Sequence, residues 1–258
     1  MNAPQDIGSP RANSLSRRDA DTIFHPYTNA VANERDGPLV ITRGKGVHVW
    51  DEDGTEYIEG MSGLWCASLG FGEDRLADAA ARQMRILPFY HGFSQKSHPP
   101  QIELAERLLA LAPVPMAKVF FCNSGSEAAD SAVKMIRYMN NALGLPEKKK
   151  IISRFKAYHG VTIAAASLTG VPLNHASFDL PLDGFLHTDM PHPYRFAEPG
   201  ETDEDFATRC ADNLDRMIVD EGAETVAAFF AEPVMGAGGV IVPPATYFAK
   251  IQAVLQKH

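Results

Sequence analysis

The sequence predicts an α/β protein in which helices cover both faces of a mostly parallel sheet. Short apolar segments of strand length alternate with helical segments of ten or more residues through the C-terminal part of the chain. A small antiparallel meander precedes this alternation. The 258 residues are 45% hydrophobic, which is enough for one sizeable core with a smaller appendage. We therefore expect a large α/β domain over residues 91–258, preceded over residues 22–90 by a segment of a small α+β domain.

The N-terminal part begins with a polar stretch. Residues 1–21 are rich in Asn, Ser, Arg and Asp, without an apolar run that would suit a signal peptide or a membrane span, and we expect a mobile tail there. The strand-like segments that follow are separated at residues 44–46 and 51–54, which predicts a meander of three short antiparallel strands. Apolar residues at helical spacing then predict helices over residues 75–87 and 101–111.

The rest of the chain carries the alternation of strands and helices. Buried strands are predicted over residues 118–122, 150–153 and 225–231. The last of these is apolar on both faces, as is typical of a central strand in a parallel sheet. Four helices are predicted between and after these strands, over residues 123–144, 161–167, 202–221 and 245–256.

Composition and charge argue against several classes of protein. With 24 basic and 32 acidic residues the formal net charge is −8, whereas a nucleic-acid surface needs a clustered positive field. Cys66, Cys122 and Cys210 are far apart and form no C-x-x-C pair, which favours a reducing, cytoplasmic compartment. No histidines stand at the spacing of metal ligands, so no metal site is expected.

The first motif with chemical potential is a turn between a strand and a helix. An apolar segment runs through Ser124-Gly125-Ser126 directly into the predicted helix. Such a turn presents backbone N–H groups at the positive end of a helix dipole, beside two hydroxyls, and suits a phosphate group. Alternatively, a serine only caps the helix and Glu127 favours its first turn. The Walker and dinucleotide-binding patterns of nucleotide sites are missing from the sequence.

Two further motifs follow at the ends of strands. Tyr158-His159-Gly160 places an aromatic side chain on a loop, where it can stack on a planar ring or pack as a half-buried residue. Glu232 ends an apolar strand before a glycine-rich turn; ligands of open α/β sheets collect at this edge, although such an acid can also simply face solvent. A phosphate-binding turn, an aromatic side chain that can stack and a carboxylate together indicate a phosphorylated aromatic cofactor.

The order of these motifs resembles that of the class III (omega) aminotransferases, which depend on pyridoxal phosphate. The segments that carry the resemblance are Gly63-Leu64-Trp65-Cys66, residues 87–91, residues 123–128, Tyr158-His159-Gly160 and residues 231–239. The similarity extends from about residue 23 to the end and is greatest to the gamma-aminobutyrate:pyruvate and omega-amino acid:pyruvate transaminases. It implies the fold of type I pyridoxal-phosphate-dependent transferases, a homodimer, and transfer of an amino group from an omega-amino acid or amine to pyruvate.

The resemblance also implies roles for individual residues. Ser124, Gly125 and Ser126 are expected to hold the cofactor phosphate. Tyr158 is expected to stack on the pyridine ring, with His159 beside it. Glu232 is the remaining cofactor-site residue, and it is expected to hydrogen-bond the aspartate that faces the pyridine nitrogen.

A substrate pocket is implied by the same resemblance. Tyr27, Trp65 and Phe93 are expected to line it, partly across a dimer interface, although their residue types alone would favour core or interface packing. The family's Schiff-base lysine and its pyridine-nitrogen aspartate are expected beyond residue 258, so no catalytic residue is assigned within this chain. We therefore expect an N-terminal fragment that is inactive alone. The alternatives are an aminomutase or racemase of the same fold, and a non-catalytic binding protein built on the truncated fold.

Overall fold

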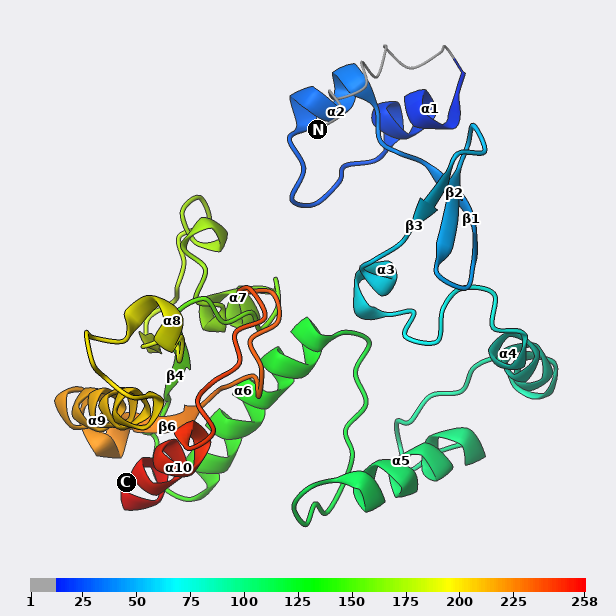
Figure 1. The fold of residues 1–258 in the computed structure, drawn as a ribbon. Coiled ribbons are helices and arrows are strands. Elements are labelled where there is room, and N and C mark those ends of the chain that lie inside the picture. Colours follow the sequence, from blue (N-terminus) through cyan, green and yellow to red (C-terminus); the bar gives the residue numbers. More distant parts are fainter. Residues whose placement is uncertain (1–12) are drawn as a thin grey trace. The chain divides into compact units, whose positions relative to one another are not determined.

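The computed structural model describes residues 13–258, shown as a ribbon in Figure 1. The chain divides into two compact units, Met1–Arg107 and Leu108–His258. This division falls later in the chain than the domain boundary after residue 90 that the sequence predicted, and that boundary stays a prediction. No helix within residues 13–258 is long and apolar enough to cross a membrane.

The first unit contains the predicted meander. Its elements are α1 (Leu15–Thr22), α2 (Ala30–Asp36), β1 (Ile41–Lys45), β2 (His48–Asp51), β3 (Glu56–Ile58), α3 (Ser62–Trp65), α4 (Asp74–Ile86) and most of α5 (Pro99–Leu111). The three strands pair antiparallel in the order β1-β2-β3. Asp51 closes the turn after β2, since its carboxylate accepts the N–H of Asp53 at 3.0 Å and of Thr55 at 2.8 Å. The meander that the sequence predicted is confirmed.

Helix α1 corrects part of the predicted tail. Residues 1–12 lie outside the described residues, but Leu15–Thr22 are helical. The hydroxyl of Ser14 caps this helix, and the carboxylate of Glu52 accepts the N–H groups of Leu15 and Ser16 at 3.0 and 3.2 Å. These bonds satisfy donors that a helix N-terminus otherwise leaves open. A polar composition does not reveal a partner 36 residues away in the sequence.

The second unit is an α/β layer structure. Its elements are α6 (Gly125–Ala142), β4 (Lys150–Arg154), α7 (Ile163–Leu168), η1 (Pro172–Asn174), β5 (Phe185–Thr188), α8 (Pro193–Phe196), α9 (Asp203–Glu221), η2 (Ala223–Thr225), β6 (Val226–Phe229) and α10 (Tyr247–Lys257). The strands form a parallel sheet in the order β5-β4-β6. The capping box at Thr202 and Asp205 fixes the start of α9, as the predicted helix over residues 202–221 requires.

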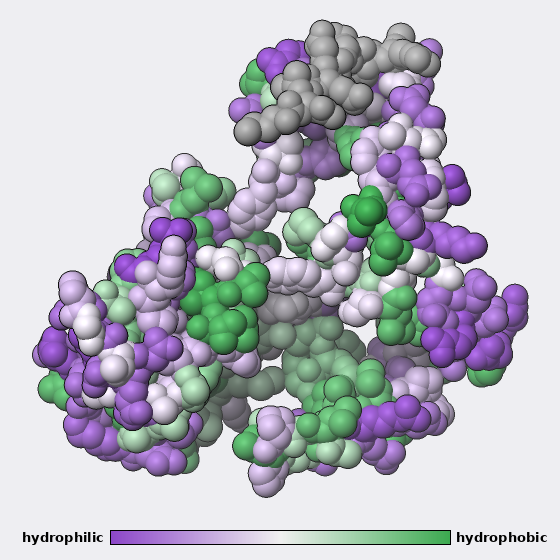
Figure 2. Space-filling view, viewed as in Figure 1, coloured by the Kyte–Doolittle hydropathy of each residue, from purple (hydrophilic) through white to green (hydrophobic). Residues whose placement is uncertain are grey.

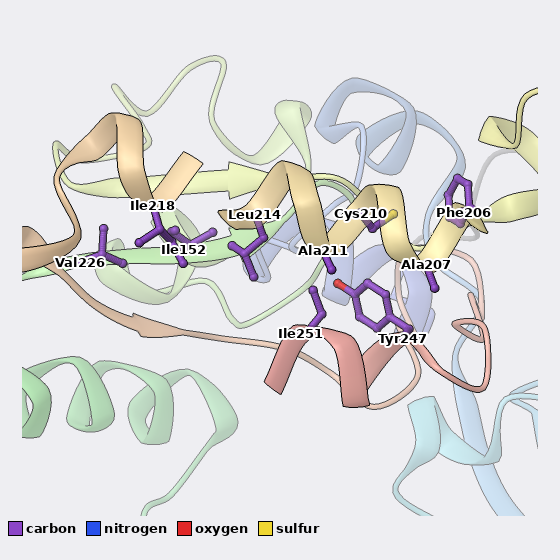
Figure 3. Packing of buried hydrophobic residues seen from close by; sticks show 10 residues of the cluster. All are labelled: Ile152, Phe206, Ala207, Cys210, Ala211, Leu214, Ile218, Val226, Tyr247 and Ile251. Carbon is purple, nitrogen blue, oxygen red and sulfur yellow. The ribbon is translucent and has the colours of Figure 1, made fainter. Parts of the chain in front are cut away.

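Helices cover both faces of this sheet, as predicted. Successive strand residues point to opposite faces, and Ile151 and Ile152 at the centre of β4 are both fully buried. Ile151 packs with Val133 of α6 and Leu168 of α7. On the other face, Ile152 belongs to a larger cluster of side chains from α9 and α10, shown in Figure 3. β4 is therefore the central strand, sandwiched between two helical layers.

Two strand predictions need correction. Residues 118–122 form no strand in the structure, and Phe120 is exposed. A strand needs a neighbour to pair with, and within the described residues neither sheet includes this segment. The strand at residues 225–231 is present as β6, but it lies at an edge of the three-stranded sheet and not at its centre. The apolar pattern identified the strand but not its place in the order.

Candidate functional site

The start of α6 is a helix N-terminus with backbone N–H donors that the helix itself does not pair. The Ser124 hydroxyl accepts the N–H of Glu127 at 3.1 Å, so this serine does cap the helix. Its own hydroxyl proton remains available for donation. The N–H groups of Gly125 and Ser126 belong to the first turn of α6, where a helix offers its N–H groups no acceptor of its own. Ser124 can therefore cap α6 while the same turn offers hydrogen-bond donors to an anion.

Open space lies beside Gly125, because a Cβ built on this glycine would meet nothing within 4 Å. By contrast, Gly160 is in close contact with the same turn. A Cβ on Gly160 would lie 2.6 Å from Ser126 Oγ and 2.8 Å from Ser126 Cα, and its φ of +131° also disfavours a side chain. The loop between β4 and α7 therefore runs directly against the start of α6, and only glycine permits this approach.

Two hydrogen-bonded contacts fix this loop on α6. Val161 donates its N–H to Ser126 Oγ at 3.0 Å, which leaves the serine proton free to be donated elsewhere. The Asp130 carboxylate accepts the Thr162 hydroxyl and the N–H of Ala165, both at 2.8 Å. Asp130 thus caps the start of α7 from the neighbouring helix, and both helix starts are held in one arrangement.

Glu232 joins the loop to the third motif. Its carboxylate accepts the N–H of Tyr158 at 2.9 Å and the N–H of Gly236 at 3.0 Å, one on each oxygen. The alternative that Glu232 simply faces solvent is therefore wrong. This carboxylate holds the Tyr158 backbone beside the turn after β6, while the Tyr158 side chain keeps an exposed surface.

His159 is a half-buried member of the group. Its backbone N–H donates to the Thr169 hydroxyl at 2.9 Å, and its ring meets Phe230 edge-on with centroids 5.8 Å apart. Burial lowers the pKa of His159; the negative charge of Glu232 opposes this shift, and the positive charge of Arg154 adds to it. The buried Nε2 atom has no hydrogen-bond partner within residues 13–258. A neutral ring with one unused nitrogen results.

Arg154 is the functional residue that the sequence analysis missed. It ends β4, is fully buried, and donates from Nη2 to the carbonyl oxygen of Glu232 at 2.6 Å. Its guanidinium lies 5.8 Å from the ring centroid of Tyr247 and 5.7 Å from that of Phe248. The available signal was a charged residue directly after the apolar pair Ile151-Ile152 and Ser153.

The predicted substrate-pocket residues are in the other unit. Tyr27, Trp65 and Phe93 all lie within Met1–Arg107, and all three side chains are exposed. No ring contact joins the three among the described residues. The structure thus brings together the six predicted cofactor residues through the loop, Glu232 and α6, and leaves the pocket assignment as a prediction.

The family follows from comparison with known proteins. The sequence model for Aminotransferase class-III matches residues 30–258. The chain belongs to this family. Class III aminotransferases use pyridoxal phosphate and have the type I fold of pyridoxal-phosphate-dependent enzymes, which agrees with the α/β class and the cofactor predicted from the sequence.

Individual relatives of this class III chain are also similar along nearly all of it. It is 51% identical over 255 residues to gamma-aminobutyrate transaminase 1, mitochondrial, of Oryza sativa subsp. indica, covering 98% of this chain and 49% of that protein. It is 54% identical to vanillin aminotransferase of Capsicum frutescens, covering 92% and 51%. The structure of an omega transaminase from Pseudomonas jessenii in complex with PMP matches with a TM-score of 0.93 and 60% identity, covering 95% and 54%. The chain spans about half the length of the curated relatives it matches.

The site residues of this class III chain fit a phosphorylated ring. Gly125 offers open space beside two N–H donors, and two serine hydroxyls have a proton to donate. The nearby loop presents Tyr158, whose backbone is held by Glu232. Phosphate donors and an aromatic side chain thus occur in one framework of hydrogen bonds.

Proposed function

We propose that the chain forms the cofactor-holding half of a transaminase that moves an amino group from an omega-amino acid or amine, similar to gamma-aminobutyrate, to pyruvate. The observation that carries the proposal is the pair of contacts that joins the three motifs. Val161 binds Ser126 at 3.0 Å, and Tyr158 binds Glu232 at 2.9 Å. The named gamma-aminobutyrate and omega transaminases support the choice of reaction and amino donor.

In this proposal each residue has a separate task. The N–H groups of Gly125 and Ser126, with the hydroxyls of Ser124 and Ser126, hold the phosphate at the positive end of α6. Tyr158 lies against the ring, and Glu232 keeps the Tyr158 loop in place. When bound, pyridoxal phosphate supplies an electron sink for chemistry at the substrate carbon.

The covalent lysine and the aspartate for the ring nitrogen are proposed to lie in the half of the relatives that this chain does not cover. Lys134 on α6 and Lys156 in the loop after β4 are both exposed, and neither is assigned the role. Residues 1–258 alone are therefore expected to lack transaminase activity. Tyr27, Trp65 and Phe93 are proposed to line the substrate pocket in the complete protein, as the resemblance implies.

A homodimer is part of the proposal. α6 exposes an apolar face made of Met135, Tyr138 and Met139, spaced three and four residues apart and therefore on one side of the helix. Figure 2 shows hydrophobic residues gathered over parts of the surface. Exposed apolar faces of this kind mark protein contacts. A cytoplasmic location stays a prediction from the cysteines, and the named relative from Oryza sativa subsp. indica is mitochondrial.

The proposed phosphate site is tested by the affinity of residues 1–258 for pyridoxamine 5′-phosphate, which binds without a covalent lysine. Gly125→Asp places a negative charge at the open start of α6, where an acidic residue otherwise stabilises a helix, so the fold should survive. We expect affinity to fall about ten-fold or more, as for a lost charge-assisted contact. Gly60→Asp adds the same charge at another open, exposed glycine and serves as the control. Equal affinity of both variants would refute the phosphate site.

The choice of acceptor needs a separate measurement on the complete protein. With gamma-aminobutyrate as donor, alanine formed from pyruvate is compared with glutamate formed from 2-oxoglutarate. The proposal expects alanine to form faster. Preferential formation of glutamate would contradict the pyruvate assignment while leaving the cofactor site untouched.

A further inference from the structure

We propose that Arg154 is a positioning residue, which sets the geometry of the candidate site by fixing the backbone of Glu232. The inference rests on the proposed function in that it assigns this site to a cofactor. Strand β4 ends at Arg154, and the Arg154 side chain is fully buried. A buried cation is costly unless its environment compensates the charge, so its retention at this place points to a specific task.

The task follows from where β4 and β6 separate. The N–H of Phe230 donates to the carbonyl of Ile152 at 2.8 Å, a backbone contact between the two strands. Two residues further along each segment, Arg154 bridges to Glu232 with its side chain, donating from Nη2 to the carbonyl at 2.6 Å. The guanidinium therefore continues the connection between the strands beyond their ladder.

This bond anchors the main chain of Glu232, whereas the carboxylate of the same residue is engaged elsewhere. One carboxylate oxygen accepts the N–H of Tyr158, and the other accepts the N–H of Gly236. Because one carboxylate holds both amides, a shift of the Glu232 backbone would disturb both contacts. Arg154 provides that support from the strand that also leads into the Tyr158 loop.

The surroundings hold the guanidinium itself in place. Its Nε and Nη1 atoms have no hydrogen-bond partner in the part of the chain that the structure describes, and the rings of Tyr247 and Phe248 lie 5.8 and 5.7 Å from Cζ. Aromatic faces stabilise a cation that has lost its water. Burial raises the pKa of Tyr247 to about 12, so this ring stays neutral beside the cation at physiological pH. The first two residues of α10 therefore supply the aromatic rings that stabilise the guanidinium.

The positive charge of Arg154 also affects His159 in the candidate site. It contributes to the lowered pKa of His159, after burial as the main cause and against the opposing charge of Glu232. Replacing Arg154 by an apolar residue should therefore change both the loop geometry and the titration of His159. A side chain that only fills space would do neither.

The test compares Arg154→Met and Arg154→Lys with Arg216→Met, which removes an exposed arginine from α9. Hydrogen exchange is measured on residues 1–258 at the amides of Tyr158 and Gly236, with the Phe206 amide in α9 as internal reference. In Arg154→Met, we expect exchange at the two loop amides to rise about ten-fold relative to Phe206, because their local opening becomes easier. Arg154→Lys, which can still donate to the carbonyl, should recover part of the protection. Arg216→Met should leave both amides unchanged.

Equal protection of both loop amides in wild type and Arg154→Met, with only a lower melting temperature, would overturn the inference. If Arg154→Met does not fold, selective loosening in Arg154→Lys supports it, and unchanged protection in Arg154→Lys overturns it. The pyridoxamine phosphate affinity of the folded variants gives an independent readout. A wild-type chain that does not bind this probe contradicts the proposed function, while the exchange data still decide the role of Arg154. Binding that is unchanged in a loosened variant would refute its link to the cofactor site.

Discussion

Val161 donates its backbone N–H to the hydroxyl of Ser126 at 3.0 Å, across 35 residues of sequence. This bond places the loop after β4 against the first turn of α6. Gly160 makes the approach possible, because any side chain there would collide with Ser126.

Gly160→Ala should destabilise the second unit by about 2–4 kcal/mol, since it combines a clash with a disfavoured positive φ. The measurement is urea unfolding of residues 1–258. Gly200→Ala is the matched control, because Gly200 also has a positive φ but open space around its Cα. The control should lose only about 1 kcal/mol, the cost of the backbone conformation. Equal losses in both variants would show that the contact with Ser126 is not tight.

Asp130→Ala should cost about 1–3 kcal/mol, because it leaves the Thr162 hydroxyl and the Ala165 N–H without their acceptor. Asp130→Asn keeps an oxygen acceptor and should retain most of the stability. Asp212→Ala, an exposed change on α9, serves as control in the same unfolding assay. A loss in Asp130→Ala no larger than in the control would contradict the role of Asp130 as a cap for α7.

Stability should decrease as the pH falls below about 6.5, the ordinary pKa of histidine. Burial lowers the pKa of His159 and of His187 in the folded state, so the unfolded chain binds more protons in this range. The contribution of these two histidines to the free energy of unfolding is therefore fully present above pH 6.5 and decreases as the pH falls toward their folded pKa values. Urea titrations at pH 7.5, 6.5 and 5.5 measure this slope. His159→Gln should flatten it, and an unchanged slope in this variant would contradict the role of His159.

Cys210 should resist alkylation in the native chain. Burial, with a smaller contribution from the charge of Asp189, raises the pKa of its thiol to about 12, and only the thiolate reacts. Cys66 is exposed and should react readily with iodoacetamide at pH 8. Mass spectrometry of peptides before and after unfolding in urea checks the difference. Native labelling of Cys210 as fast as of Cys66 would mean that α9 is not packed as described.

Residues 1–258 should associate in solution through apolar surface such as the exposed face of α6. Light scattering and binding of a hydrophobic dye measure this, and Tyr138→Glu should reduce both, because a charge resists burial. Lys134→Glu alters the charge of an exposed neighbour on α6 and is the control. A wild-type monomer that binds no dye would contradict the expectation of an uncovered surface.

Local patterns were sufficient to predict much of the second unit. Ile151 and Ile152, side by side and both buried, are what a strand covered on two faces requires, and the structure confirms it. The Ser124 turn was recognised because capping and anion binding depend on the same few residues at a helix start. These features are encoded within a short window of sequence.

Features that depend on distant partners were missed. Residues 118–122 have the apolar composition of a strand, but no strand of the described sheets pairs with them. Arg154 directly follows the strand predicted over residues 150–153, yet its significance depends on Glu232 and on two aromatic rings, all more than 70 residues away. Helix α1 depends on Glu52 in the same way. No pattern within the segment itself can report such contacts.

Within residues 13–258, the carboxylate of Glu232 accepts hydrogen bonds from two main-chain N–H groups, those of Tyr158 and Gly236. Every residue except proline carries such a donor. These two hydrogen bonds therefore do not depend on which side chain stands at position 158. A substitution at position 158 can keep both bonds to Glu232, so the side chain that we propose to face the cofactor can be exchanged without loss of this backbone support.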